Sequence, residues 1–201
     1  FRLQFKQTGT GTASASTIGA DTSGNDNHYT SANLSAYDSN LPDCPENNFA
    51  TLLQLRSGEN ASSQTFSEGN LQWTSSAYGY NSTGSSMNIP TSGKWYWEVL
   101  CTAVGGGDPY IGCQQSDDAA NGWAVWLGNT SSDFSWSSVG YTYDGGVGTA
   151  GNFATWGAGD ILGFAVDCDG ATLKCYKNNV LAGTLSNLIA NKIVLPAGSG
   201  H

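Results

Sequence analysis

The clearest alternation of hydrophobic and polar positions lies in residues 159–179. Read with a period of two, this segment predicts two antiparallel strands joined at Asp169-Gly170, a pair suited to the positive φ angles of a type I′ turn. Pairing across that turn puts four apolar side chains on one face: Val166 opposite Leu173, and Phe164 opposite Cys175. A hairpin with one apolar face packs that face against a second sheet. The segment therefore predicts a core hairpin of a β-sandwich.

A second alternation lies upstream, in residues 92–101. Four apolar side chains recur at every second position: Trp95, Trp97, Val99 and Cys101. We expect this tryptophan face to point into the sandwich, and Glu98 to point the other way, where its charge stays hydrated or paired. No helical period extends beyond two turns anywhere in the chain, so any helix should be short.

Four segments in this order resemble SPRY (B30.2-type) domains. They are Ser92–Val99, Tyr110–Cys113, Gly122–Trp126 followed by Tyr141–Gly145, and the hairpin of residues 159–179. The resemblance implies an all-β fold, an antiparallel β-sandwich of the SPRY/concanavalin-like jelly-roll kind. Asn179 stands where that family usually has glycine. Since asparagine also adopts the left-handed backbone conformation, we expect this turn to be kept.

The first third of the chain carries a different resemblance. Asp21–Thr30, Asp43–Thr51 and Ser67–Leu71 are similar to the lead-in that precedes SPRY-like modules in tail-fibre and other virion proteins of tailed bacteriophages. We therefore divide the chain into an extended, loop-rich lead-in over residues 1–68 and a SPRY-like sandwich over residues 69–201. The lead-in is expected to hold an edge strand at Phe1–Phe5 and a turn at D-T-S-G-N (residues 21–25).

Both ends of the sequence suggest a piece cut from a longer polypeptide. The chain begins with Phe1 instead of Met and shows no basic-then-apolar leader. The family normally adds a final strand after the position of Pro196, and we expect the sandwich to lack it. Either Phe1–Phe5 fills that edge, or the remaining sequence is not included.

Composition and charge narrow the classes of partner. Charged residues make up 11% of the chain, which leaves solubility to its many Ser, Thr, Asn and Gly residues. The net charge of −9 disfavours nucleic acid and anionic lipid, because both would need a basic surface. No run of about 18 apolar residues is present, so we expect no membrane insertion.

The sequence offers little for metal or disulfide chemistry. Its five cysteines are Cys44, Cys101, Cys113, Cys168 and Cys175. Cys101 and Cys113 flank a glycine-rich loop with matching parity, which leaves a disulfide open, although small buried thiols fit a reducing cytoplasm better. The oxygens of residues 21–27 suit either calcium or a self-bonded turn, and the turn is favoured because no EF-hand spacing is present. We expect no metal and no cofactor.

Catalysis finds no support in the residue pattern. Glycan-cleaving enzymes need two carboxyl groups facing one cleft, and the four glutamates are not spaced to share a strand face. A triad would have only His28 and His201 to draw on, and neither lies beside a nucleophile with a supporting motif. We therefore predict no catalytic residues and no enzymatic activity.

Aromatic residues in the middle of the chain are the better candidates for binding. Trp123, Trp126 and Trp156 are expected to fill the sandwich, as the family motif suggests. This leaves Trp136, Tyr141 and Tyr143 as predicted surface ligand-binding residues, set among Ser, Asn and Gly. Exposed aromatic rings with neighbouring amides and hydroxyls are suited to neutral glycans.

The functional hypothesis is a non-enzymatic structural and adhesion module of a phage virion, in a tail fibre or related appendage. It would be made in the host cytoplasm, pack with other copies of itself and with other virion proteins, and present loops to a host-surface glycan or protein. One alternative is a polysaccharide-degrading enzyme or a glycan-binding accessory domain. A second alternative is a peptide-binding SPRY adaptor.

Overall fold

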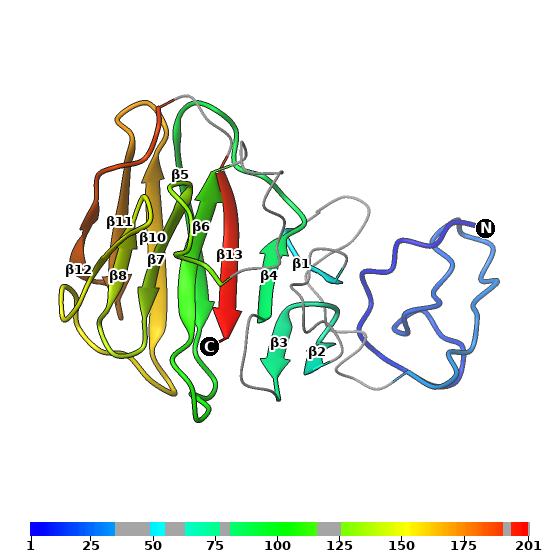
Figure 1. Ribbon diagram of the computed structural model, residues 1–201. Helices are drawn as coiled ribbons and strands as arrows, with labels where there is room; N and C mark the ends of the chain where they lie inside the picture. Colours follow the sequence, from blue (N-terminus) through cyan, green and yellow to red (C-terminus); the bar gives the residue numbers. More distant parts are fainter. Residues whose placement is uncertain (35–48, 55–62, 77–80, 116–125, 191–193, 201) are drawn as a thin grey trace. The chain divides into compact units, whose positions relative to one another are not determined.

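The computed structural model describes residues 1–34, 49–54, 63–76, 81–115, 126–190 and 194–200, and these contain thirteen strands and no α-helix (Figure 1). In the first half of the chain the strands are β1 (Leu52–Leu53), β2 (Gln64–Ser67), β3 (Gln72–Ser75), β4 (Asn81–Ser85), β5 (Lys94–Leu100) and β6 (Tyr110–Gln115). The remaining strands are β7 (Asp133–Ser137), β8 (Thr142–Asp144), β9 (Val147–Thr149), β10 (Ile161–Asp167), β11 (Thr172–Lys177), β12 (Val180–Leu185) and β13 (Val194–Gly200). Within the described residues no helix is long and apolar enough to span a membrane.

Two large sheets form the sandwich. The seven-stranded sheet has the order β1-β4-β13-β6-β7-β8-β9, and the four-stranded sheet has the order β12-β11-β10-β5. Their strand pairs are antiparallel, while β2 and β3 form a separate two-stranded sheet. The prediction of an all-β antiparallel sandwich is therefore confirmed.

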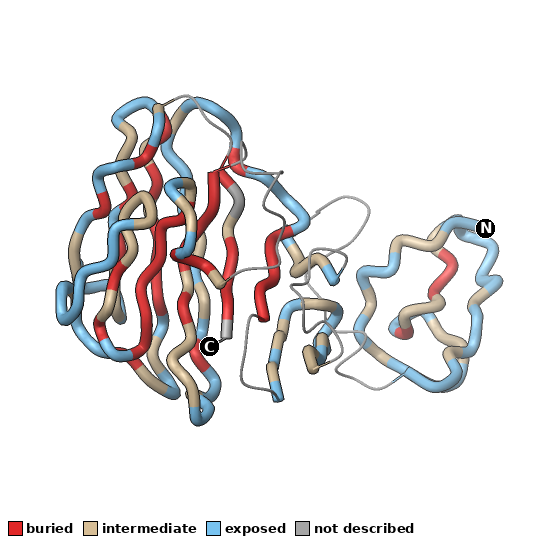
Figure 2. The backbone as a smooth tube through the Cα atoms, in the orientation of Figure 1, coloured by how far each residue is buried: buried red, intermediate tan, exposed pale blue. Residues whose placement is uncertain are grey.

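The predicted core hairpin is β10–β11. Phe164 lies opposite Cys175, and Val166 lies opposite Leu173, as the sequence predicted. All four side chains are buried in the core between the two sheets, together with Phe134 and Trp136 of β7. Figure 2 shows this burial as continuous stretches along the strands of the sandwich.

The turn predicted at Asp169-Gly170 is wrong in type, although the register around it is right. The last pair is Asp167 with Thr172, which leaves a four-residue loop whose positive φ falls at Ala171. The carboxylate of Asp167 accepts the backbone N–H groups of Asp169 and Gly170, at 3.2 and 2.8 Å, and so fixes a different bend. Cys168 donates its N–H to Gly93, which extends the pairing toward β5 instead of closing the hairpin.

A two-residue turn with two positive φ angles is found instead in the next hairpin, β11–β12. Asn178 (φ 48°) and Asn179 (φ 66°) join β11 to β12, with Lys177 opposite Val180. This is the pattern of a type I′ turn, and asparagine tolerates it. The expectation that Asn179 keeps the turn is confirmed.

The β5 strand packs most of its predicted face into the core. Trp97 stacks on Phe164, with ring centroids 5.3 Å apart and planes 15° apart, and Val99 also packs against the core. Trp95 departs from the prediction, because its side chain is 45% exposed and its Nε1 donates to the carbonyl of Ser92 at 2.9 Å. The tryptophan face therefore ends at the rim of the sandwich.

The chain divides into two compact units. One comprises Phe1–Thr51 and Phe66–Gln72, and the other comprises Leu52–Thr65 and Trp73–His201. In the first, the described residues 1–34 hold only isolated bridges, Leu3 with Asp21 and Gly9 with Thr17. The strand predicted at Phe1–Phe5 is not formed, since Phe5 has a positive φ of 55° and both phenylalanines are exposed.

The last described segment of the chain also belongs to the seven-stranded sheet. Val194–Gly200 forms β13, which lies between β4 and β6 in the seven-stranded sheet. The sandwich boundary at residue 69 and the expected lack of a further strand stay predictions.

We expect Phe164→Ala to lower the free energy of unfolding by about 3–5 kcal/mol, because it leaves a cavity beneath Trp97 in a fully buried site. Chemical denaturation followed by tryptophan fluorescence measures the change. Val180→Ala is the control, since that side chain is 69% exposed and its truncation should alter stability little. Equal effects of the two changes would contradict the placement of the core.

Candidate functional site

The structure separates the three predicted ligand-binding residues. Trp136 is fully buried between the two sheets, and its Nε1 donates to the carbonyl of Ala154 at 2.9 Å, so its prediction as a surface residue is wrong. Tyr141 and Tyr143 are partly exposed and lie together, with ring centroids 5.1 Å apart. Of the three tryptophans predicted to be core, Trp156 is buried there, whereas Trp123 lies outside the described residues.

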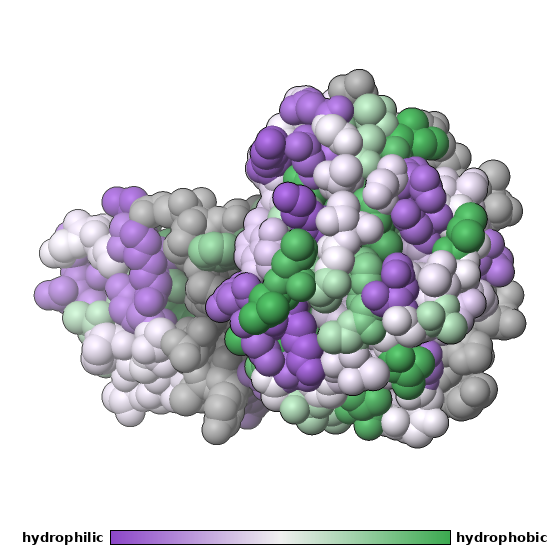
Figure 3. Space-filling model, turned by 90° about the vertical axis from the view of Figure 1, so that its left-hand side faces the viewer, coloured by the Kyte–Doolittle hydropathy of each residue, from purple (hydrophilic) through white to green (hydrophobic). Residues whose placement is uncertain are grey.

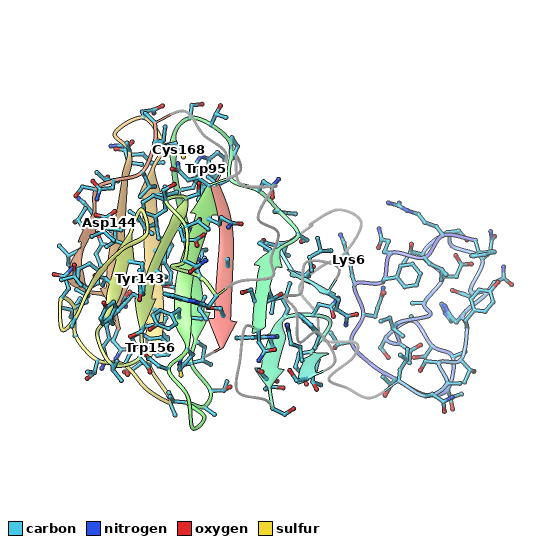
Figure 4. The ribbon with its side chains drawn as sticks, viewed as in Figure 1. Lys6, Trp95, Tyr143, Asp144, Trp156 and Cys168 are labelled. Atoms are coloured by element: carbon cyan, nitrogen blue, oxygen red, sulfur yellow. The ribbon has the colours of Figure 1, made fainter. Side chains whose placement is uncertain are left out.

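The pairing of β6, β7 and β8 explains why the tyrosines lie away from the main core. Phe134 and Trp136 point inward from β7, so Ser135 and Ser137 point to the outer face of the seven-stranded sheet. Tyr143 lies opposite Ser135, and Tyr110 lies opposite Ser137. Both tyrosines therefore project from the outer face, where Figure 4 labels Tyr143 on β8.

Four aromatic side chains form a second, smaller cluster on this outer face, which we call the aromatic face: Tyr110, Trp126, Tyr141 and Tyr143. Tyr143 is its centre. Its ring centroid lies 4.7 Å from that of Trp126 in an edge-to-face arrangement, and 5.8 Å from that of Tyr110. Trp126 is thus partly buried against the outer face instead of filling the space between the sheets, which corrects its prediction as sandwich core.

Two glycines leave room for these rings. A Cβ on Gly128 would lie 2.5 Å from the ring of Trp126 and 2.6 Å from that of Tyr143. A Cβ on Gly148 would lie 2.6 Å from the hydroxyl of Tyr141 and 2.9 Å from the ring of Tyr143. Gly128 also has a φ of +138°, a conformation that side-chain-bearing residues rarely adopt.

The loop of residues 126–130 is fixed over the sheet by buried polar contacts. Leu127 donates its N–H to the hydroxyl of Ser199 at 3.0 Å, and its carbonyl accepts the hydroxyl of Ser135 at 2.9 Å. The carboxylate of Asp133 accepts the backbone N–H groups of Gly128 and Thr130, at 3.1 and 2.9 Å. These hydrogen bonds hold the loop, and with it Trp126, against the outer face of the sheet.

Asp133 is 1% exposed, and burial raises the pKa of its carboxyl group above the ordinary value of 3.8. Its hydrogen bonds oppose the effect, including one from the side-chain amide of Gln114 at 3.0 Å. The backbone of the loop is therefore bound by a carboxylate whose charged form is destabilised by burial and stabilised by its hydrogen bonds.

Two hydroxyl groups of the aromatic face, those of Tyr110 and Tyr143, have raised pKa values. Burial raises the pKa of Tyr110 and of Tyr143 above the ordinary value of 10.0, and the negative charge of Asp108 adds to both shifts. Asp108 is itself positioned by the hydroxyl of Ser138, which donates to it at 2.8 Å. Neutral phenols beside a carboxylate provide hydrogen-bond donors and an acceptor around an aromatic surface.

Other candidate chemistry has structural partners. Asp21, at the start of the D-T-S-G-N turn, accepts the backbone N–H groups of Arg2, Ser23 and Asn27 and the hydroxyl of Ser23. These contacts lower the pKa of Asp21, the N–H of Arg2 most of all, and form the predicted self-bonded turn. His28 accepts the N–H of Asp21 at its Nδ1, 2.9 Å away, which fixes the ring within the same turn.

The described part of the chain holds neither a cluster of metal ligands nor a disulfide. No group of three or more His, Cys, Asp or Glu residues there is arranged to hold a metal ion. Cys101, Cys113, Cys168 and Cys175 are buried free thiols, so the disulfide left open between Cys101 and Cys113 is not formed. Cys44 lies outside the described residues.

Sequence reasoning missed Tyr110, Trp126 and Asp133 as parts of the site. Tyr110 had a usable signal, because it lies three positions before the inward-facing Cys113 and therefore on the opposite face. For Asp133 the alternation of residues 133–137 indicates the face but not the contacts, and Trp126 had no signal, since both depend on how the loop of residues 126–130 folds back over the sheet.

Comparisons with known proteins report on the fold. No protein-family model matches the chain, and no curated protein matches it. Among the solved structures that match, stonustoxin is 18% identical with a TM-score of 0.55, over 75% of this chain and 25% of that one. The SPRY domain of human HERC1 is 17% identical with a TM-score of 0.49, over 60% of this chain and 74% of that one.

Stonustoxin contains a B30.2/SPRY domain, and this chain spans about a quarter of its length. Together with the strand order, that likeness shows that the fold is a SPRY-like antiparallel β-sandwich. At this level of identity the likeness concerns the fold alone.

We expect Gly128→Ala to destabilise the protein by about 3 kcal/mol, because the added methyl group both strains the backbone and overlaps the rings of Trp126 and Tyr143. Thermal unfolding with tryptophan fluorescence measures it. Gly151→Ala is the control, since its φ is also positive (+62°) but nothing lies within 4 Å of its Cβ. An equal cost for both changes would show that backbone strain alone, without ring contact, decides the effect.

Asp133 gives a prediction for pH. Because its pKa is raised in the folded protein, the stability that it contributes is greatest below 3.8 and is lost as pH rises through its folded pKa. The difference in free energy of unfolding between wild type and Asp133→Asn should therefore fall with rising pH across that window. Urea denaturation at a series of pH values measures it. A difference that grows with pH would mean that the hydrogen bonds to the carboxylate outweigh its burial.

Proposed function

We propose that this chain is a non-enzymatic binding module of a phage virion appendage, such as a tail fibre, that uses the aromatic face to contact a host-surface glycan or protein. The observation that carries the proposal is the partly exposed Tyr141–Tyr143–Trp126 group on the outer face of the seven-stranded sheet. The virion context rests on the resemblance of residues 21–71 to phage lead-in segments. Both halves of the proposal are open to direct test.

The aromatic face suits a neutral glycan on chemical grounds. Aromatic rings stack on the apolar face of a sugar, while hydroxyl donors and a carboxylate acceptor bond the sugar's hydroxyl groups. Tyr141, Tyr143 and Asp108 supply these groups close to one another, and burial raises the pKa of Tyr143, which keeps its phenol neutral. The low content of charged residues, 11%, also fits a neutral ligand better than an ionic one.

A SPRY-like fold favours a second candidate ligand, a protein segment. SPRY domains generally mediate protein interactions. An extended peptide would contact the same aromatic side chains with its own apolar groups. Glycan and peptide are therefore the two ligand classes to compare.

We expect Tyr141→Ala to weaken binding to a glycan about tenfold, because it removes one stacking ring, worth about 1.4 kcal/mol, while leaving Tyr143 packed between Gly128 and Gly148. A glycan array carrying bacterial surface polysaccharides, followed by calorimetry on the strongest hit, measures the loss. Tyr29→Ala is the control, since that tyrosine is half exposed and packs on Phe1 instead.

The same experiment separates the alternatives. Unchanged affinity in Tyr141→Ala would contradict the aromatic face as the site. Binding to peptides and to no glycan would identify the protein-interaction role. Shortening of polysaccharide chains during incubation with the wild-type protein would contradict the non-enzymatic role.

A further inference from the structure

Four strands lie at the edges of the two large sheets, and one of them differs from the others. β1 and β9 close the seven-stranded sheet with only two and three residues. β12 pairs irregularly with β11, with a register shift at Cys175/Tyr176. β12 lies at the left of Figure 1, and Figure 3 views the molecule from that side, where small hydrophobic groups are set among polar ones. β5 keeps one register with β10 over all seven of its residues. Short and irregular edges resist further pairing, and a long regular edge invites it.

The backbone groups that β5 presents at its free edge can be identified from its inner pairing. Gly93 accepts the N–H of Cys168 at 3.0 Å, and Cys101 donates to Asp160 at 2.9 Å. Since backbone groups alternate sides along an antiparallel strand, the odd-numbered residues of β5 face β10. The N–H and carbonyl groups of Lys94, Tyr96, Glu98 and Leu100 therefore face away from it, and no described residue forms a backbone hydrogen bond with them.

The side chains along this edge are already ordered. The ring of Tyr96, which is 53% exposed, lies across Gly163, and its hydroxyl donates to Glu98 at 2.8 Å. Lys94 lies 3.2 Å from the carboxylate of Asp167. Leu100 adds an apolar side chain that is 58% exposed. Pairing at this edge would consequently cost little additional side-chain entropy.

The charges of β5 are complementary to those of its own copy. In an antiparallel pair of two β5 strands centred on Tyr96, Lys94 of each copy lies opposite Glu98 of the other. Three of the four outward-facing residues, Lys94, Tyr96 and Glu98, then fall in hydrogen-bonded pairs between the two β5 strands. Opposite charges directly across a strand pair stabilise it, so this register is favoured over a general apolar contact.

We propose that β5 pairs edge to edge with β5 of a second copy of this chain, about a two-fold axis at Tyr96, and so joins two four-stranded sheets into one of eight strands. This goes beyond the proposed function, which concerns ligand binding at the aromatic face, and its test is separate from the test of ligand binding. The occupant is a second copy because Lys94 and Glu98 provide the opposite charges that the axis brings together. An unrelated extended peptide would not need this reciprocal arrangement.

The test measures association of the full chain by sedimentation equilibrium. Wild type should form a dimer, and Lys94→Glu should weaken it on the order of tenfold, because it places like charges opposite each other at two symmetric positions. The double variant Lys94→Glu/Glu98→Lys should restore the dimer, since it exchanges the two charges across the axis. Lys174→Glu is the matched control, being an exposed lysine on the same sheet but on the inner strand β11.

A second measurement tests the register. In the proposed pair the two Tyr96 Cα atoms lie about 5.5 Å apart, within the reach of a disulfide. Tyr96→Cys should therefore cross-link two chains under mild oxidation, whereas Lys174→Cys should not. A monomeric wild type, a Lys94→Glu dimer as tight as that of Lys174→Glu, or equal cross-linking of both cysteine variants would overturn the proposal. Glycan binding by a monomeric wild type would leave the proposed ligand role standing while removing this interface.

Discussion

Successive side chains of a β-strand point to opposite faces of its sheet, and this alternation determines the register of the sandwich. On β10 and β11 it gathers Phe164, Val166, Leu173 and Cys175 on one face, and Trp97 of β5 stacks against Phe164 from the next strand. With that face buried, a slip of one residue would expose the entire set. The burial of this face therefore fixes a single register for the strands of the four-stranded sheet. The same register determines which side chains lie on the outer face of this sheet and which backbone groups β5 presents at its free edge.

The seven-stranded sheet uses the alternation differently, because it buries side chains on both faces. Phe134 and Trp136 fill the space between the sheets, while Ser135 and Asp133 on the opposite face hold the loop of residues 126–130. Small polar side chains here allow a loop to lie close to the sheet and to have its backbone groups satisfied. Buried hydrogen bonds, with a smaller apolar cluster, thus position Trp126 beside Tyr143.

The sequence alone predicted the strand register where the hydrophobic period and the chain connectivity indicate the same pairing. The β10–β11 register followed from the alternating pattern, but the turn did not, because one register fits a loop of either two or four residues. The contact of Asp167 with Gly170 decides between them. Trp136 was misplaced although D-F-S-W-S alternates plainly, since its abundant serines suggested a surface loop. Serines on an outer face that a loop covers look the same in sequence as serines in solvent.

The two proposed interaction surfaces belong to different sheets, and this bears on how the module would work. The aromatic face projects from β6 and β8 of the seven-stranded sheet, whereas the free edge of β5 belongs to the four-stranded sheet. Pairing at β5 would use backbone groups and leave Tyr141 and Tyr143 uncovered. Two copies joined in this way would present two identical aromatic faces. Because a second contact on the same surface is intramolecular, weak binding to a repeating glycan would be strengthened without any change in the site itself.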